Sequence, residues 1–293
     1  MEITGQMMQL IFSGLTIGSI YALIATGFVI TYNVTGVLNF AQGEFAMLGA
    51  MTAISLVSAG FNQIPAFLVT IVFVFFLGAL FERTAIYPAR RSEGFVLIII
   101  TIGVSITLRG IALLIWGTNP RSLPPFTKGG ALELFGAVVQ RQSLWAIGVA
   151  FVSLILMYLF FERTYTGKAV TACVVNKFAA RLMGIRPERM SLIAISISAS
   201  LGALGGIIIA PISGATYEMG LMLGMKAFIA AVFGGLTNAP AAVTGALIIG
   251  LLEAFTEGLW SSGYKDAVSF FVLLLVLFLK PNGIFEKATG KRV

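Results

Sequence analysis

The stretch "GVLNFAQGEFAMLGA", residues 36–50, places two glycines, an asparagine, a glutamine and a glutamate between two long apolar segments. Each segment is about long enough to cross a ~30 Å hydrocarbon core as a helix. Backbone that leaves the helix inside a membrane must line a cavity or be buried in protein, because lipid cannot satisfy its polar groups. The stretch therefore predicts an interrupted membrane helix, with a new helix starting near Gly43.

The composition of the whole chain supports a membrane protein. The 293 residues are 58% hydrophobic and 11% charged, with a mean hydropathy of +0.98, which is far outside the range of soluble domains. Apolar continuity predicts nine segments, near residues 7–31, 43–60, 62–81, 94–117, 143–161, 188–210, 222–235, 240–256 and 265–280. Because the seventh is short, we predict an all-α polytopic membrane protein with about eight or nine transmembrane segments, in one domain over residues 1–293.

The net charge of +7 is better explained by topology than by nucleic-acid binding, since the cations do not cluster with polar or aromatic residues. Cytoplasmic loops of membrane proteins are enriched in Lys and Arg. With the N-terminus outside, the inward loops hold most of the cations: Arg83, Arg90, Arg91, Arg163, Lys168, Lys177, Arg181, Arg186, Arg189, Lys280, Lys287, Lys291 and Arg292. The longest outward loop holds Arg121, Lys128 and Arg141. We therefore predict an outside N-terminus and a cytoplasmic C-terminus.

Several residue types are scarce or absent, which argues against most enzyme chemistry. The chain has no histidine and one cysteine, Cys173, so the usual general base and metal ligand are missing and no internal disulfide can form. It also lacks a G-x-x-x-x-G-K-[ST] phosphate loop, so we expect no ATP binding by this chain and no metal site. An intramembrane enzyme is accordingly the weakest class.

A cytoplasmic segment, "TGKAVTACVVNKFAARLMGIRPERM" (residues 166–190), lies between the fifth and sixth predicted spans. Its apolar side chains recur every four residues, at Val170, Val174, Phe178 and Leu182. This spacing predicts one amphipathic helix at about 168–184, some ~24 Å long at 1.5 Å per residue and ended by Gly184. The helix either lies on lipid headgroups or docks a cytoplasmic partner.

Five blocks carry a resemblance to a known family. They are "LTIGSIYALIATGFVITYNVTGVLNFAQGEFAMLGA" near the start, "ERTAIYPAR" after the third span, "ACVVNKFAARLMGI" in the cytoplasmic segment, "GMKAFIAAVFGG" in the seventh, and "YKDAVSFFVLLLVLFLKPNGIF" at the end. In this order, over almost the whole chain, they resemble the permease subunits of branched-chain amino acid ABC importers, specifically the shorter of the two permeases.

The resemblance implies a subunit of the bacterial or archaeal cytoplasmic membrane that forms a translocation pathway with a second permease. It implies two cytoplasmic ATP-binding-cassette ATPases that bind ATP, and a soluble substrate-binding protein. In this family the cytoplasmic helix sits in a cleft of the ATPase, which maps by position onto Ala172, Asn176, Ala180 and Gly184. The chain departs from the family at Val175, where an acidic residue is frequent. Related permeases carry branched-chain amino acids, urea, amides or small organic acids, and these alternatives stay open.

A second interruption, "GGLTNAPAA" (residues 234–242), follows the short seventh segment. Two interrupted elements in corresponding places of two halves point to a substrate route between them. The candidate pathway residues are Asn39, Gln42, Glu44, Thr237 and Asn238. Glu44 either attracts the ammonium group of a zwitterion or only stabilises the start of its helix.

Four charged residues fall inside or beside spans: Glu44, Arg109, Lys226 and Glu253. An ion-coupled secondary transporter, the alternative to an ABC subunit, commonly has such charges in mid-membrane and works alone. For Arg109, Lys226 and Glu253 we favour structural ion pairing or snorkelling to the interface over a substrate role. Glycines at helix-packing spacing, such as Gly14 and Gly18, predict close packing within the chain rather than a dimer.

Overall fold

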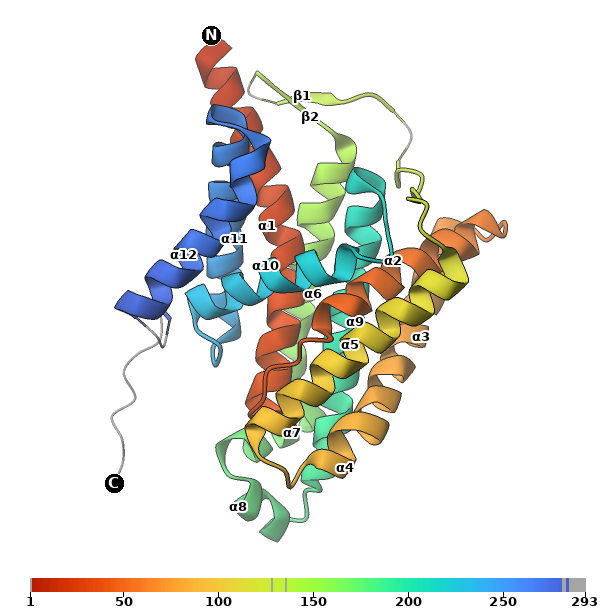
Figure 1. Cartoon of the computed structure of the whole chain (residues 1–293), viewed down its shortest axis with the longest axis vertical. Helices are drawn as coiled ribbons and strands as arrows, with labels where there is room; N and C mark the ends of the chain where they lie inside the picture. Colours follow the sequence, from red (N-terminus) through yellow and green to blue (C-terminus); the bar gives the residue numbers. More distant parts are fainter. Residues whose placement is uncertain (1, 128, 135, 281–282, 285–293) are drawn as a thin grey trace.

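The computed structural model describes residues 2–127, 129–134, 136–280 and 283–284, and almost all ordered elements within them are helical (Figure 1). The elements are α1 (Glu2–Thr35), α2 (Gln42–Ser58), α3 (Gln63–Phe81), η1 (Glu82–Ile86), α4 (Tyr87–Ala89), α5 (Gly94–Trp116), β1 (Leu132–Leu134), β2 (Ala137–Val139), α6 (Arg141–Arg163), α7 (Tyr165–Val175), α8 (Lys177–Leu182), α9 (Pro187–Ser213), α10 (Met219–Gly234), α11 (Ala239–Leu259), η2 (Ser262–Tyr264) and α12 (Lys265–Leu279). The predicted cations Lys128, Lys287, Lys291 and Arg292 lie outside the described residues.

The predicted membrane segments are confirmed as helices, and all but one of them end within about five residues of the expected positions. In the described part of the chain, seven helices are long and apolar enough to cross a membrane. Two more, α2 with 17 residues and α10 with 16, are shorter. The chain is therefore a polytopic helical membrane protein in which two elements are too short to span comfortably.

One predicted end was wrong. The third segment continues past its expected end at residue 81, through the π-helical η1 and the single turn α4, to Ala89. The charged pair Glu82 and Arg83 indicates a helix end in the sequence, yet Glu82 is buried and the helix runs on. A charged side chain that is buried within the protein does not have to mark the end of a membrane helix.

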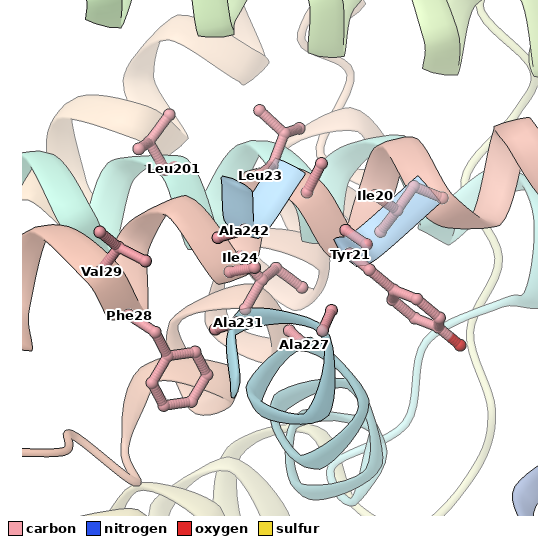
Figure 2. Packing of buried hydrophobic residues seen from close by; sticks show 14 of the residues in the cluster. Ile20, Tyr21, Leu23, Ile24, Phe28, Val29, Leu201, Ala227, Ala231 and Ala242 are labelled. Atoms are coloured by element: carbon pink, nitrogen blue, oxygen red, sulfur yellow. The ribbon is translucent and has the colours of Figure 1, made fainter. Parts of the chain in front are cut away.

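The long first helix lies at the centre of the molecule. In its 18-residue apolar window 89% of the residues are buried, a larger share than in any other described span. Gly14 and Gly18 of α1 contact Gly250 of α11 so closely that an added Cβ would meet backbone. Figure 2 shows the apolar side chains of α1 packed beside Leu201 of α9 and Ala231 of α10. The glycine pairs thus serve packing within the chain, as predicted.

The two short helices occupy equivalent places in two sets of helices. A long helix, a glycine with positive φ, a short helix and two further spans follow one another in α1–α2–α3–α5 and again in α9–α10–α11–α12. The glycines are Gly36 (φ 78°) and Gly214 (φ 74°). Figure 1 shows α1 and α9 running in opposite directions, and both α2 and α10 starting in the middle of the molecule. We call α2 and α10 the half-helices.

This arrangement corrects one prediction. The counterpart of the interruption at residues 36–41 is the segment 214–218, which precedes α10, and not 234–242, which follows it. The sequence "GATYEMG" that starts this second interruption has a single charge and little polarity. It falls between the predicted segments 188–210 and 222–235, so the sequence predicts only a loop there.

The cytoplasmic segment also differs from its prediction. The expected single helix is two helices, α7 and α8, which meet at Asn176 in extended backbone (φ −155°, ψ 102°). The Asn176 side chain accepts the N–H groups of Phe178 and Ala179, both at 3.0 Å, and so starts α8 as an N-cap. The polar side chain that fitted an amphipathic stripe therefore interrupts the helix.

Candidate functional site

The first interruption buries two of the predicted pathway residues. Asn39 and Gln42 are both enclosed by protein. The Asn39 side-chain oxygen accepts the N–H of Ala41 at 3.1 Å, which fixes the turn before α2. Gln42 bonds Ser198 of α9 twice, because its Nε2 donates to the Ser198 carbonyl at 2.9 Å and its Oε1 accepts from the Ser198 hydroxyl at 2.8 Å. In this conformation Asn39 fixes the turn, and Gln42 holds the start of α2 against α9.

Glu44, the third predicted residue of this stretch, is 1% exposed and paired. Its Oε1 accepts from Ser105 Oγ at 2.9 Å and from Arg109 at 2.9 Å, both on α5. Its Oε2 faces Gly220, at the start of α10, and has no hydrogen-bond partner in the described structure. The carboxylate thus lies where the positive ends of two half-helices meet, which favours a negative charge.

The starts of the two half-helices are in direct contact. A Cβ on Gly43 would overlap the carbonyl oxygen of Gly220 and approach the backbone of Gly224. Only glycine on both sides allows this approach. The junction of α2 and α10 is therefore closed in this conformation, and the positive helix ends are already compensated by Glu44.

A cavity of about 1160 Å³ lies elsewhere, between α1, α6, α7 and α11. Most of its lining is apolar, and its polar lining residues are Thr26, Asn33, Tyr158, Glu162, Thr171, Thr237 and Asn238. No Lys or Arg is among the described residues that line it. Such a surface suits a ligand with an apolar body and few hydrogen-bonding groups.

The remaining two predicted pathway residues, Thr237 and Asn238, belong to this cavity. Asn33 Nδ2 donates to the Thr237 carbonyl at 3.0 Å, which ties the end of α1 to the loop before α11. The Asn238 side chain accepts the N–H of Ala241 at 3.3 Å and caps α11. The structure therefore separates the five predicted residues into two places, with Asn39, Gln42 and Glu44 absent from the cavity lining.

Arg109 was expected to form a structural ion pair, but the sequence interpretation missed Ser105, Ser198 and Asn33 as partners of the predicted residues. Ser105 and Arg109 are four residues apart, so they share a helix face, and this spacing is a signal that Ser105 bonds the same partner. Ser198 and Asn33 carried no such signal. Their roles depend on which helices pack together.

A second group of buried charges is confirmed as structural pairing. Lys226 of α10 lies 3.2 Å from Glu253 of α11 and 2.7 Å from Asp266 of α12. Glu253 also accepts from Tyr21 at 2.8 Å and from Ser269 at 2.6 Å. We call these five residues the Glu253 cluster, and it joins α1, α10, α11 and α12 at one point.

The four residues mapped to ATPase coupling define the shape of the cytoplasmic segment. The Ala172 carbonyl accepts the N–H of Asn176 at the end of α7. Gly184, with φ 82°, follows the end of α8, and its N–H reaches the Arg181 carbonyl, so the predicted helix end is confirmed. Ala180 is only 4% exposed and packs inward, and its role in ATPase coupling stays a prediction.

The exposed face of this segment is apolar. Beyond the buried Val170, the predicted stripe is open, since Phe178 and Leu182 are 73% and 74% exposed, and Met183 beside them is 82% exposed. We call Phe178, Leu182 and Met183 the α8 apolar face. Arg181 pairs with Glu188 at the start of α9 at 2.7 Å, which connects α8 to a membrane helix.

Comparison with known proteins gives the family. The family described as "Branched-chain amino acid transport system / permease component" matches residues 10–277. The permease protein LivH of the high-affinity branched-chain amino acid transport system of Escherichia coli (strain K12) is 34% identical, over 98% of this chain and 97% of its own. The corresponding BraD of Pseudomonas aeruginosa is 32% identical over 100% and 99%.

More distant proteins share parts of this similarity. The ribose import permease protein RbsC of Escherichia coli (strain K12) is 26% identical over 90% of this chain and 83% of its own. PsaBC from Streptococcus pneumoniae, solved in complex with a Fab, has a similar fold, with a TM-score of 0.51 at 13% identity over 92% of this chain and 91% of that one. The sequence blocks, the helical membrane fold and the full-length identity agree: the chain belongs to the permease-component family of branched-chain amino acid transport systems, whose members are transport subunits and not enzymes.

Proposed function

We propose that the chain forms, together with a second permease subunit, the membrane pathway of an ABC importer for branched-chain or related amino acids. The observation that carries the proposal is the identity of 34% to a branched-chain amino acid permease over nearly the full length of both chains. The cavity supports the substrate class, because an apolar lining with hydroxyl and amide groups fits an amino acid with an aliphatic side chain. Urea, amides and small organic acids have less apolar surface to bury there.

The proposed route has a closed and an open part. The cavity lined by Thr237 and Asn238 forms its inner vestibule. The contact of Gly43 with Gly220 closes the route at the half-helix junction, where Asn39, Gln42 and Glu44 are buried. Separation of the half-helices exposes these polar residues to the substrate.

Energy for transport comes from partner subunits in this proposal. The α8 apolar face docks in a cleft of an ATP-binding-cassette ATPase. Two such ATPases bind and hydrolyse ATP, because this chain itself has no phosphate-loop motif. A soluble binding protein delivers the substrate from outside. Internal pairing of Glu44 with Arg109 and of Glu253 with Lys226 supports this division of labour, since neither of these two carboxylates is an isolated charge for ion coupling.

The proposed orientation places the N-terminus outside and the C-terminus in the cytoplasm. Figure 1 shows α4, α7 and α8 at one end of the molecule and the β1–β2 hairpin at the other. The cation-rich loops after α3 and α6 thus lie on the same side, as the positive-inside rule requires of cytoplasmic loops.

Uptake in cells tests the substrate class. A strain that lacks its own branched-chain amino acid permeases is given this chain with its partner subunits, and uptake of radiolabelled leucine is measured. We expect unlabelled isoleucine and valine to compete, and urea, acetamide and lactate not to. Competition by one of the latter compounds alone would contradict the substrate class.

The cavity has its own test. Val243→Phe places a ring on the part of α11 that lines the cavity and so reduces the cavity volume. Leu252→Phe adds the same ring on an exposed part of the same helix. We expect the first variant to lower leucine uptake and the second to leave it unchanged. Equal uptake by both variants would remove the cavity from the route.

A further inference from the structure

Each half-helix carries a single charged residue, and each of these charges is paired with another membrane helix. On α2 it is Glu44, paired with Arg109 of α5 at 2.9 Å. On α10 it is Lys226, paired with Asp266 of α12 at 2.7 Å. Because α5 and α12 hold equivalent places in the two sets of helices, the two pairs are related, with the signs exchanged.

Within the Glu253 cluster, Glu253 itself is fully bonded, whereas Asp266 is 41% exposed and lies 2.7 Å from Lys226. Both oxygens of Glu253 accept hydrogen bonds, Oε1 from Ser269 and Oε2 from Tyr21 and Lys226. The Lys226 side chain is 9% exposed and contacts two carboxylates. Any movement of α10 relative to α11 and α12 breaks the contacts of Lys226 with Glu253 and Asp266, and at Glu253, which is 1% exposed, no water is available to replace the lost partner.

The pair of Glu44 and Arg109 forms fewer of its possible hydrogen bonds than Glu253 does. A single guanidinium nitrogen reaches a single carboxylate oxygen. Glu44 Oε2 and Arg109 Nε are both buried without a hydrogen-bond partner among the described residues. The Arg109 side chain is 24% exposed, so it can follow a moving helix into a more polar environment.

Stability alone does not account for a half-bonded pair in this place. Buried ion pairs are often no more stabilising than apolar residues of similar volume, because desolvation offsets the attraction. A pair with free bonding capacity at the moving junction permits a second arrangement of the same groups. Glu253, with both oxygens bonded, has no such free capacity.

We propose that Glu44 and Arg109 form a positioning contact that rearranges when half-helix α2 moves during transport, while the Glu253 cluster fixes half-helix α10. This proposal rests on the transport function proposed above. In it, Arg109 and Glu44 set the coupling between ATP hydrolysis and the opening of the α2–α10 junction. Lys226 sets the stability of the fold.

The test compares neutral variants of the two groups in the purified complex with its partner subunits. The double variant Glu44→Gln/Arg109→Met removes both charges of the first pair and leaves no buried charge unpaired. Lys226→Met removes the cation of the cluster, and Arg121→Met is the control, because Arg121 is exposed in the outward loop and its guanidinium bonds the Trp116 carbonyl. Thermal stability and leucine transported per ATP hydrolysed are measured for each.

We expect the double variant to assemble with a thermal midpoint close to the wild type, and to transport about tenfold less leucine per ATP, within the usual range of coupling energies. We expect Lys226→Met to lower the thermal midpoint, with the control unchanged in both measurements. Wild-type coupling in the double variant, or loss of coupling together with loss of assembly, would overturn the proposal.

A distance measurement separates positioning from simple structural damage. Nitroxide labels at Ser58→Cys on α2 and Met222→Cys on α10, with Cys173→Ser, report the separation of the half-helices. We expect two distance populations in the wild-type complex, one without ATP and one with ATP trapped, and a single population in the double variant. The same two populations in both complexes would contradict the proposed rearrangement, and a wild-type complex that transports no leucine would instead refute the transport function.

Discussion

Replacing Gly43 by alanine changes the closest contact between the two half-helices. The added methyl would lie 2.7 Å from the Cα of Gly224 and 2.8 Å from its nitrogen, besides overlapping the carbonyl oxygen of Gly220. Carbon atoms pack at about 3.5–4.0 Å, so α2 and α10 must separate by about 1 Å to accept it. All of the nearest atoms belong to backbone, and no side chain can rotate away.

The expected cost follows from this overlap. Overpacking a close-packed interior costs typically about 1–3 kcal/mol. At about 2–4 °C per kcal/mol, a value for soluble chains of somewhat smaller size, the thermal midpoint falls by several degrees. Because the junction can no longer close, we also expect ATP hydrolysis to continue with little transport.

The assay is thermal unfolding of the purified chain in detergent, combined with leucine uptake by the assembled complex. The matched control is Gly103→Ala in α5, where a Cβ meets nothing within 4 Å of the described structure. Alanine is the better helix former, so this control is expected to be neutral or slightly stabilising. Equal stability and equal uptake of the two variants would refute the closed half-helix junction.

Four further predictions concern the cytoplasmic segment. Phe178→Asp is expected to weaken binding of the ATPase in a pull-down while the chain stays folded, and unchanged binding and uptake would favour a helix that lies on lipid. Met183→Cys, with Cys173→Ser, should react with a membrane-impermeant maleimide only after permeabilisation, and labelling of intact cells would reverse the orientation. In the natural chain burial raises the pKa of the Cys173 thiol, so its labelling at neutral pH should be slow even after permeabilisation and faster as the pH rises toward that pKa; rapid labelling at pH 7 would contradict its burial. Asn176→Ala should lower the thermal midpoint by an amount equivalent to about 1 kcal/mol through loss of the α8 cap, and Asn176→Asp should preserve it.

The membrane helices could be predicted from the sequence because lipid imposes a strong and simple constraint. A run of apolar residues that ends at Gly, Pro or a charge must satisfy its backbone internally, so its type and approximate ends follow. The start of α2 at Gln42 was predicted within one residue for this reason. The continuation of this span beyond α3 to Ala89 was missed because Glu82 is charged but buried.

The site was less predictable because it depends on which helices pack together. Glu44 and Arg109 are 65 positions apart, and no local pattern indicates their contact. The break at Asn176 was missed because an asparagine within an amphipathic pattern fits both a polar stripe and an N-cap. The cavity arises from four separate elements, so only its residues Thr237 and Asn238 had a signal in the sequence, as part of an interruption.

Nucleotide-dependent uptake by the reconstituted complex tests the central claim most directly. Proteoliposomes contain this chain, the second permease and the two ATPases, with binding protein and radiolabelled leucine outside and ATP on the ATPase side. We predict uptake that requires ATP and this chain, and that continues when ionophores remove all ion gradients. Uptake that stops with the ionophores, or proceeds without ATP, would show an ion-coupled transporter and contradict the assignment as an ABC importer permease.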